Sequence, residues 1–262
     1  MQSNELGNAM GRFAVGGSAG FALGPLLAGG VYVFGAQFLW VFTAIALLGV
    51  LLYLYAFTGE ADTTNIGESK SSATSTKTGT NDWSSFGKLF FVIASRSILF
   101  SVLSIFIPIL YITVINGEAS ASSLALTMYF AMGAVLTYMG GALSDKLGFL
   151  KTVRLGNLIF LPSVLVFIFV PNIWGFFGAM IPMAFGVFSQ YGPITVLGQK
   201  YLAKNAGFAS GITLGLGITL GGLVAPYVGH LADIYDVQTA LMTLIPVGLM
   251  GLLMSLWLKE PK

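Results

Sequence analysis

The sequence predicts an all-α, polytopic membrane protein, and three observations lead to this fold class. Hydrophobic residues make up 56% of the 262 residues, charged residues make up only 8%, and the mean hydropathy is +0.86. A soluble domain carries about 25% charged residues, so this chain has too few charges to cover a water-facing surface. The other two observations are a series of long apolar stretches and the way in which positive charges alternate between them.

Eight apolar stretches are long enough to cross a bilayer, which takes roughly 20 mostly apolar residues in a helix. Short turn signals such as Pro171-Asn172 divide the longer uncharged runs. The predicted spans are Phe13–Phe34, Gln37–Phe57, Phe86–Ile115, Ser122–Ser144, Leu155–Val170, Ile173–Leu197, Gly207–His230 and Val237–Leu258.

Positive charges orient these spans. If the first residues are cytoplasmic, eleven of the twelve Lys and Arg lie on the cytoplasmic side, none lies outside, and Arg96 lies within the third span. This is the bias expected of an inserted membrane protein. We therefore predict a multi-pass protein of the cell membrane, surrounded by lipid, with both termini cytoplasmic.

Composition also excludes several functions. The net charge of +2 is too small to argue for a nucleic-acid partner, and there is no cysteine. No cluster of His and carboxylates indicates a metal, no phosphate-binding loop indicates a nucleotide, and no nucleophile–base pair indicates an enzyme. We expect neither catalysis nor a cofactor.

A polar linker divides the chain into two blocks. Residues 61–84 are rich in Ser, Thr, Gly and Asn, as in mobile linkers, and they are predicted to be cytoplasmic. Before the linker, residues 1–60 hold two predicted helices; after it, residues 85–262 hold six.

The two helices of the first block resemble the last two of the second. Gly16–Phe57 aligns without a gap to Gly217–Leu258, and the identities include two glycines and a proline. Duplicated halves are typical of secondary transporters. The expectation is that residues 1–60 are the remnant of an N-terminal half whose first four helices are missing. The alternative is that two glycine-rich membrane helices resemble each other by composition alone.

Both copies of the repeat contain glycines four residues apart, followed by a proline. Glycines four residues apart let another backbone approach closely, and a following proline allows a bend. Such a face serves either tight static packing or a sliding seam between moving halves, and both interpretations stay open. The residues are Gly20, Gly24 and Pro25, and Gly217, Gly221 and Pro226.

A short polar loop follows the fourth predicted span. It places an acid and a base at the inner membrane surface, followed by a glycine turn. The loop is either a plain polar connection or a latch that holds neighbouring helices closed on the cytoplasmic side. Its residues are Gly141, Asp145, Lys146 and Gly148.

These motifs resemble the major facilitator superfamily. The loop is similar to its signature of glycine, Asp-Arg/Lys and glycine, although Phe149-Leu150 stand where basic residues are usual. Gly20–Pro25 resembles its glycine–proline signature on the fifth helix, often seen in antiporters. Thr195–Leu202 and Gly207–Gly215 are similar to the fosmidomycin-resistance branch. The resemblance implies a twelve-helix fold in which the eight spans correspond to helices 5–12. It also implies drug efflux and antibiotic resistance, through export of small drugs in exchange for protons by alternating access.

Arg96 is the main candidate for binding substrate. A charge inside the membrane is costly and usually faces a cavity or a partner. The resemblance places Arg96 on a cavity-lining helix, where it would hold a phosphonate or carboxylate; the alternative is that it extends toward the cytoplasmic surface. Gln190, Tyr191 and Thr195 lie on the other predicted cavity-lining helix, where they bind substrate or join helices.

Proton coupling has no obvious carrier, because no Asp or Glu lies deep in any span. His230 and Asp233 could form a proton-responsive pair, although a lone histidine at a helix end is more often interfacial. If the first four helices are missing, we expect little or no transport by the chain alone and a need for a complementing fragment or a homo-oligomer. The alternative functions are a non-transporting fragment or pseudogene product, and an uptake carrier for organic anions such as sugar phosphates.

Overall fold

The computed structural model describes residues 17, 20–31, 35, 40–59, 80–170 and 172–261, in which every regular element is helical. The predicted linker therefore lies mostly outside the described residues. The α-helices are α2 (Trp40–Gly59), α3 (Trp83–Thr113), α4 (Ala119–Leu147), α5 (Phe149–Phe169), α6 (Ile173–Phe188), α7 (Tyr191–Tyr201), α8 (Ala206–Ser210), α9 (Gly217–Ile234), α10 (Val237–Leu241) and α11 (Leu244–Trp257). Two further elements, the 3₁₀ turn η4 (Ala203–Asn205) and the π-helical η5 (Gly211–Leu216), flank α8.

The predicted fold class is confirmed. Within the described residues, six helical stretches are long and apolar enough to cross a membrane: Trp83–Thr113, Ala121–Leu147, Phe149–Phe169, Ile173–Tyr201, Ala203–Ile234 and Val237–Trp257. They correspond to the last six predicted spans. The first two predicted spans fall on shorter described helices, residues 20–31 and α2, and extend into residues that are not described.

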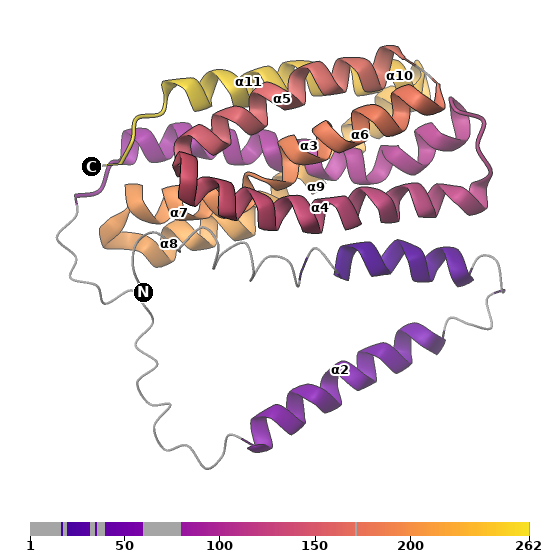
Figure 1. Cartoon of the computed structure of the whole chain (residues 1–262), viewed down its shortest axis with the longest axis horizontal. Helices are drawn as coiled ribbons and strands as arrows, with labels where there is room; N and C mark the ends of the chain where they lie inside the picture. Colours follow the sequence, from indigo (N-terminus) through magenta and orange to yellow (C-terminus); the bar gives the residue numbers. More distant parts are fainter. Residues whose placement is uncertain are drawn as a thin grey trace.

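Helix α3 lies at the centre of the six-helix block (Figure 1). It contacts α4, α7, α9 and α11, while α5 packs between α6 and α11. Buried apolar side chains form two clusters along α3, one around Phe106 and Met180 and one around Leu89 and Leu197. Because lipid is as apolar as these side chains, the block is held together in a bilayer by van der Waals packing and interhelical hydrogen bonds.

The first two helices differ in how they meet this block. The helix at residues 20–31 lies along α4, where the Phe21 ring stacks on Phe130 with 5.5 Å between ring centroids. By contrast, α2 stands apart from the block in Figure 1, and almost all of its described side chains are exposed. Its apolar surface therefore has no partner among the described helices.

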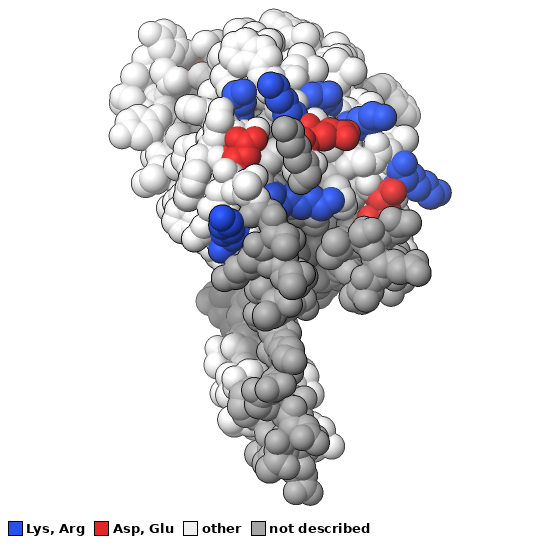
Figure 2. Space-filling view, turned by 90° about the vertical axis from the view of Figure 1, so that its left-hand side faces the viewer, with Lys and Arg blue, Asp and Glu red and all other residues white. Residues whose placement is uncertain are grey.

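Charge is concentrated at one end of the block. Figure 2 shows this end, where α4, α7 and α11 finish and α3 and α5 begin. Arg154 of α5 stabilises the end of α11. Its guanidinium donates hydrogen bonds to the carbonyl oxygens of Ser255 and Leu258, at 3.0 and 2.8 Å. Carbonyl groups at the end of a helix have no partner within the helix.

Local chemistry moves several helix boundaries from their predicted places. Helix α3 begins before Phe86 because the Asp82 carboxylate caps it, accepting hydrogen bonds from the backbone N–H and the hydroxyl of Ser85. These bonds, the hydroxyl one foremost, hold the pKa of Asp82 below its usual value, so the cap stays charged. The last predicted span turns at Met242-Thr243. The span predicted at Ile173–Leu197 is broken in its middle, at the candidate site.

Candidate substrate site

The site is built around the break between α6 and α7, at Ser189-Gln190. Pro193 has no N–H to donate to the Ser189 carbonyl four residues earlier, and its ring disfavours a continuous helix there. The backbone of α4 comes close at this point, because a Cβ on Gly140 would overlap the backbone of Ser189. Ser189 and Gln190 keep helical backbone angles, so the break is local, and it leaves the Ser189 carbonyl without the N–H that would bond to it in a regular helix.

Arg96 reaches this break from near the middle of α3. Its Nε donates to the Val187 carbonyl oxygen at 2.9 Å, and its guanidinium carbon lies 5.0 Å from the centre of the Tyr191 ring. The side chain is partly buried, and its two terminal nitrogens have no hydrogen-bond partner among the described residues. Arg96 therefore points into the bundle, and its outer donors remain available to a ligand.

Tyr129 on α4 carries a second available donor. Its side chain is 0% exposed, yet its hydroxyl has no hydrogen-bond partner in the described part of the chain. Tyr129 also lies near Arg96. Leaving a buried hydroxyl unpaired costs about 1–3 kcal/mol, so such a group calls for an explanation.

Aromatic rings form the wall next to these two donors. Phe188, the last residue of α6, lies edge-on to Tyr129 at 5.2 Å and to Phe100 at 5.8 Å between ring centroids. Phe130 and Phe21 extend the same cluster to the helix at residues 20–31. The arrangement combines a cation, a buried hydroxyl and an apolar wall, which suits an anion attached to an apolar body.

The other predicted substrate residues of this region make internal bonds. Gln190 is buried; its amide donates to the Gly186 carbonyl and accepts from Asn157 at 3.1 Å. This hydrogen bond joins α5 to the segment between α6 and α7. Thr195 is buried and donates to the Tyr191 carbonyl at 3.0 Å. Tyr191 is the member of this set that touches Arg96.

The predicted loop lies at the charged end, between α4 and α5. Gly148 has a φ of 94°, a conformation that favours glycine, and so allows α5 to start directly after α4. Lys146 is exposed in the last turn of α4, Asp145 is half-buried beside it, and Gly141 is buried one turn earlier. Phe149 occupies a position where the resemblance predicts a basic residue. The Lys200 ammonium nitrogen lies over its ring, 4.5 Å from the ring centroid.

The glycine faces differ in their packing. A Cβ on Gly20 or Gly24 would meet no neighbouring atom within 4 Å, whereas one on Gly221 would overlap the Ser97 carbonyl and the Ser101 side chain. Tight packing is therefore present in α9, against α3. The other predicted residues of these faces are Pro25 within residues 20–31, Pro226 inside α9, and Gly217 at the start of α9. The surroundings of Gly217 are not described.

Sequence reasoning missed Tyr129 and the break itself. Gly192-Pro193 in an apolar run is a signal that could have located the break. Tyr129 has no comparable signal, because one tyrosine in a membrane helix is unremarkable until its hydroxyl is seen to lack a partner. His230 and Asp233 lie on α9 far along the bundle from Arg96, and no hydrogen bond among the described residues joins them. No group of metal-ligating side chains was found in the described ranges.

A bundle of apolar helices with an intramembrane cation at a helix break defines the class of multi-pass membrane proteins that move small molecules. The sequence profile of the Major Facilitator Superfamily matches residues 2–226 and 89–262, so the chain belongs to that superfamily. Its members carry small molecules across membranes and are generally not enzymes.

One solved structure shows the same fold. It is the crystal structure of a Major Facilitator Superfamily transporter, FucP, in the outward conformation, with a TM-score of 0.57 and 17% identity. The match covers 67% of this chain and 42% of that one, so the chain spans less than half the length of FucP. No curated protein matches the sequence.

Proposed function

We propose that the chain belongs to a drug exporter that carries small anionic molecules, fosmidomycin-like phosphonates among them, out of the cell in exchange for protons. The proposal of drug export and proton exchange rests on the sequence motifs, and that of an anionic substrate rests on the site. Transport would proceed by alternating access, with the loop from Gly141 to Gly148 holding the cytoplasmic side closed in one state.

The observation that carries the proposal is the pair of unused donors at the α6–α7 break. The terminal nitrogens of Arg96 form a planar fork that matches two oxygens of a carboxylate or phosphonate. The Tyr129 hydroxyl would donate to the same anion. Because the surroundings are apolar and aromatic, these bonds would face less competition from water than they would at a surface.

We also propose the orientation and the partners. The end that bears Lys146, Lys200 and the other basic residues would face the cytoplasm. The exposed surface of α2 supports an additional partner, either a complementing fragment or a second copy of the chain, whose helices would cover it. Transport by the assembled form then needs both blocks, while anion binding needs only the six-helix block.

Drug susceptibility of cells tests the proposal. Cells in which the chain is assembled with a complementing fragment or with a second copy should tolerate more fosmidomycin than the same cells without the chain, and Arg96→Ala should remove this tolerance at equal membrane expression. Arg96→Lys keeps the charge but loses the fork, so we expect intermediate tolerance.

Each alternative function predicts a different outcome. Greater drug accumulation in expressing cells would favour an uptake carrier over an exporter. Unchanged tolerance with the chain inserted in the membrane would favour a non-transporting fragment. Equal tolerance with Arg96→Ala would contradict the role of Arg96.

A further inference from the structure

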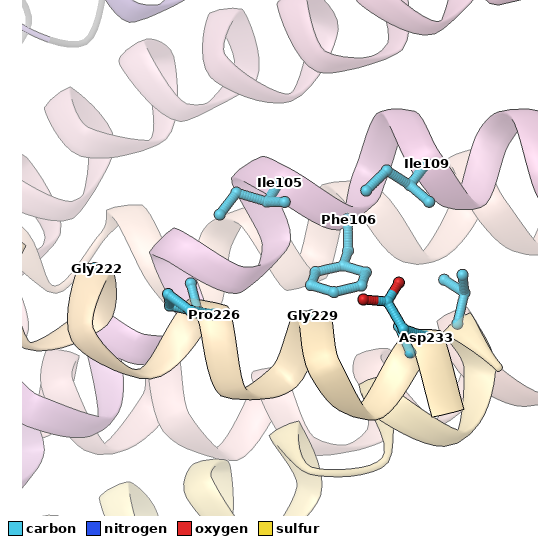
Figure 3. Close-up of a pocket in the computed structure, with 10 residues that line it drawn as sticks. Ile105, Phe106, Ile109, Gly222, Pro226, Gly229 and Asp233 are labelled. Atoms are coloured by element: carbon cyan, nitrogen blue, oxygen red, sulfur yellow. The ribbon is translucent and has the colours of Figure 1, made fainter. Parts of the chain in front are cut away.

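We propose that a pocket between α3 and α9, near the end of the bundle opposite the basic residues, binds a lipophilic organic cation. The pocket encloses about 390 Å³, within the range of small-molecule sites. Figure 3 shows Ile105, Phe106 and Ile109 of α3 facing Pro226 and Asp233 of α9.

The walls of the pocket suit an apolar body. Ile105 and Ile109 remain 47% and 37% exposed, although they lie in the interior of a membrane-spanning helix. Gly222 and Gly229 on α9 leave room opposite them, since a Cβ at either position would meet no atom of the described residues within 4 Å. An apolar ligand would gain contact with both helices without displacing a packed side chain.

Asp233 gives the pocket its charge. Its carboxylate points into the pocket beside the Phe106 ring in Figure 3, and it has no hydrogen bond or ion pair with any described residue. The only acids at this end of the described helices are Glu118, Asp233 and Asp236, and no described Lys or Arg lies there. A carboxylate without a counter-charge at the rim of an apolar pocket is complementary to a cation. The neighbouring aromatic ring would add to the attraction if the cation lies over its face.

This site is separate from the one at Arg96. Arg96 and Ile105 are nine residues apart on α3, or about 14 Å at 1.5 Å per residue. The two sites also have opposite charges, so a ligand for one is repelled by the other. The pocket can therefore be tested whether or not the anion site binds drugs.

Two probes of the same shape and opposite charge provide the test. Binding of tetraphenylphosphonium and of tetraphenylborate would be measured by titration of the purified full chain in lipid nanodiscs, with empty nanodiscs as the blank. We expect saturable binding of the phosphonium, weakened about tenfold by Asp233→Asn because the carboxylate at the exposed rim of the pocket no longer attracts the cation. Asp233→Glu should retain most of the affinity.

The matched control is Asp236→Asn. Asp236 is exposed, lies outside the pocket, and caps α10 through Thr239, a role that asparagine also fills. This control should leave the affinity unchanged, while Ile105→Trp should reduce it by filling the pocket. Equal phosphonium affinity in Asp233→Asn, or borate binding as tight as phosphonium binding, would overturn the proposal. Melting temperatures of all variants show whether a loss comes from misfolding instead.

Discussion

At the scale of single residues, the buried polar side chains divide into those that hold helices together and those that remain available. Ser97 accepts a hydrogen bond from the Gly221 N–H at 2.9 Å, and Asn157 donates to Gln190 at 3.1 Å. These groups are satisfied by the fold. The Tyr129 hydroxyl and the outer nitrogens of Arg96 are not. The distinction separates structural residues from candidate binding residues at the same helix break.

Gln190→Leu tests this assignment for a residue that the sequence placed in the substrate site. Loss of the amide leaves Asn157 short of a buried partner, and we expect the protein to lose about 1–3 kcal/mol of stability. Denaturant titration in detergent measures the loss. The double variant Asn157→Leu/Gln190→Leu should recover part of it. A stable Gln190→Leu variant with weakened drug binding would instead assign Gln190 to the substrate.

At the residue scale, the sequence singles out a residue whose chemistry is unusual for its setting. Arg96 was identifiable because a charge inside an apolar span is rare, and the structure places it at the helix break. The pairing of Gln190 with Asn157 depends on which faces of two helices meet, 33 residues apart. No local pattern encodes that geometry, and the same limit hid Tyr129.

At the scale of elements, the six spans after the linker were predictable from apolar length, but the breaks inside them were not. Pro193, in the first turn of α7, lacks the N–H that would bond to the Ser189 carbonyl, and the π-helical η5 precedes α9. Pro162 and Pro182, by contrast, lie inside continuous helices. A proline alone therefore does not determine a break; the close approach of α4 at Gly140 also contributes here.

Adjacent glycines of α9 give a matched test of helix packing. Gly221→Ala would force a methyl group into the Ser97 carbonyl of α3, so we expect a loss of about 1–3 kcal/mol. Gly222→Ala meets open space and should be neutral or stabilising by up to about 1 kcal/mol, because alanine favours helices. Thermal melting in the same detergent compares the two. Equal melting temperatures would show that α3 and α9 are not tightly packed at this point.

At the scale of the whole molecule, the charges divide the bundle into a basic end and an acidic end. Figure 2 shows the basic end, and the pocket in Figure 3 lies toward the other. Alternation of charge along the sequence predicted this division because each helix reverses the direction of the chain. How α2 relates to the rest was not predictable, since its apolar surface meets no described helix.

Cysteine labelling tests the orientation of the bundle. The chain has no cysteine, so single replacements report without background. We expect Asp236→Cys to react with a membrane-impermeant maleimide in intact cells, and Lys204→Cys to react only after the membrane is opened. The reverse pattern would place the basic end outside, and reaction of both positions in intact cells would argue against the predicted crossing of the membrane.

The central claim is that Arg96 and Tyr129 bind an anion together, and Tyr129→Phe tests it most directly. The measurement is a titration of the purified chain with fosmidomycin, alongside its melting temperature. We expect the variant to bind about tenfold more weakly, while its melting temperature stays equal or rises because an unpaired buried hydroxyl is gone. Unchanged affinity in Tyr129→Phe, or equal binding by Arg96→Ala, would contradict the claim.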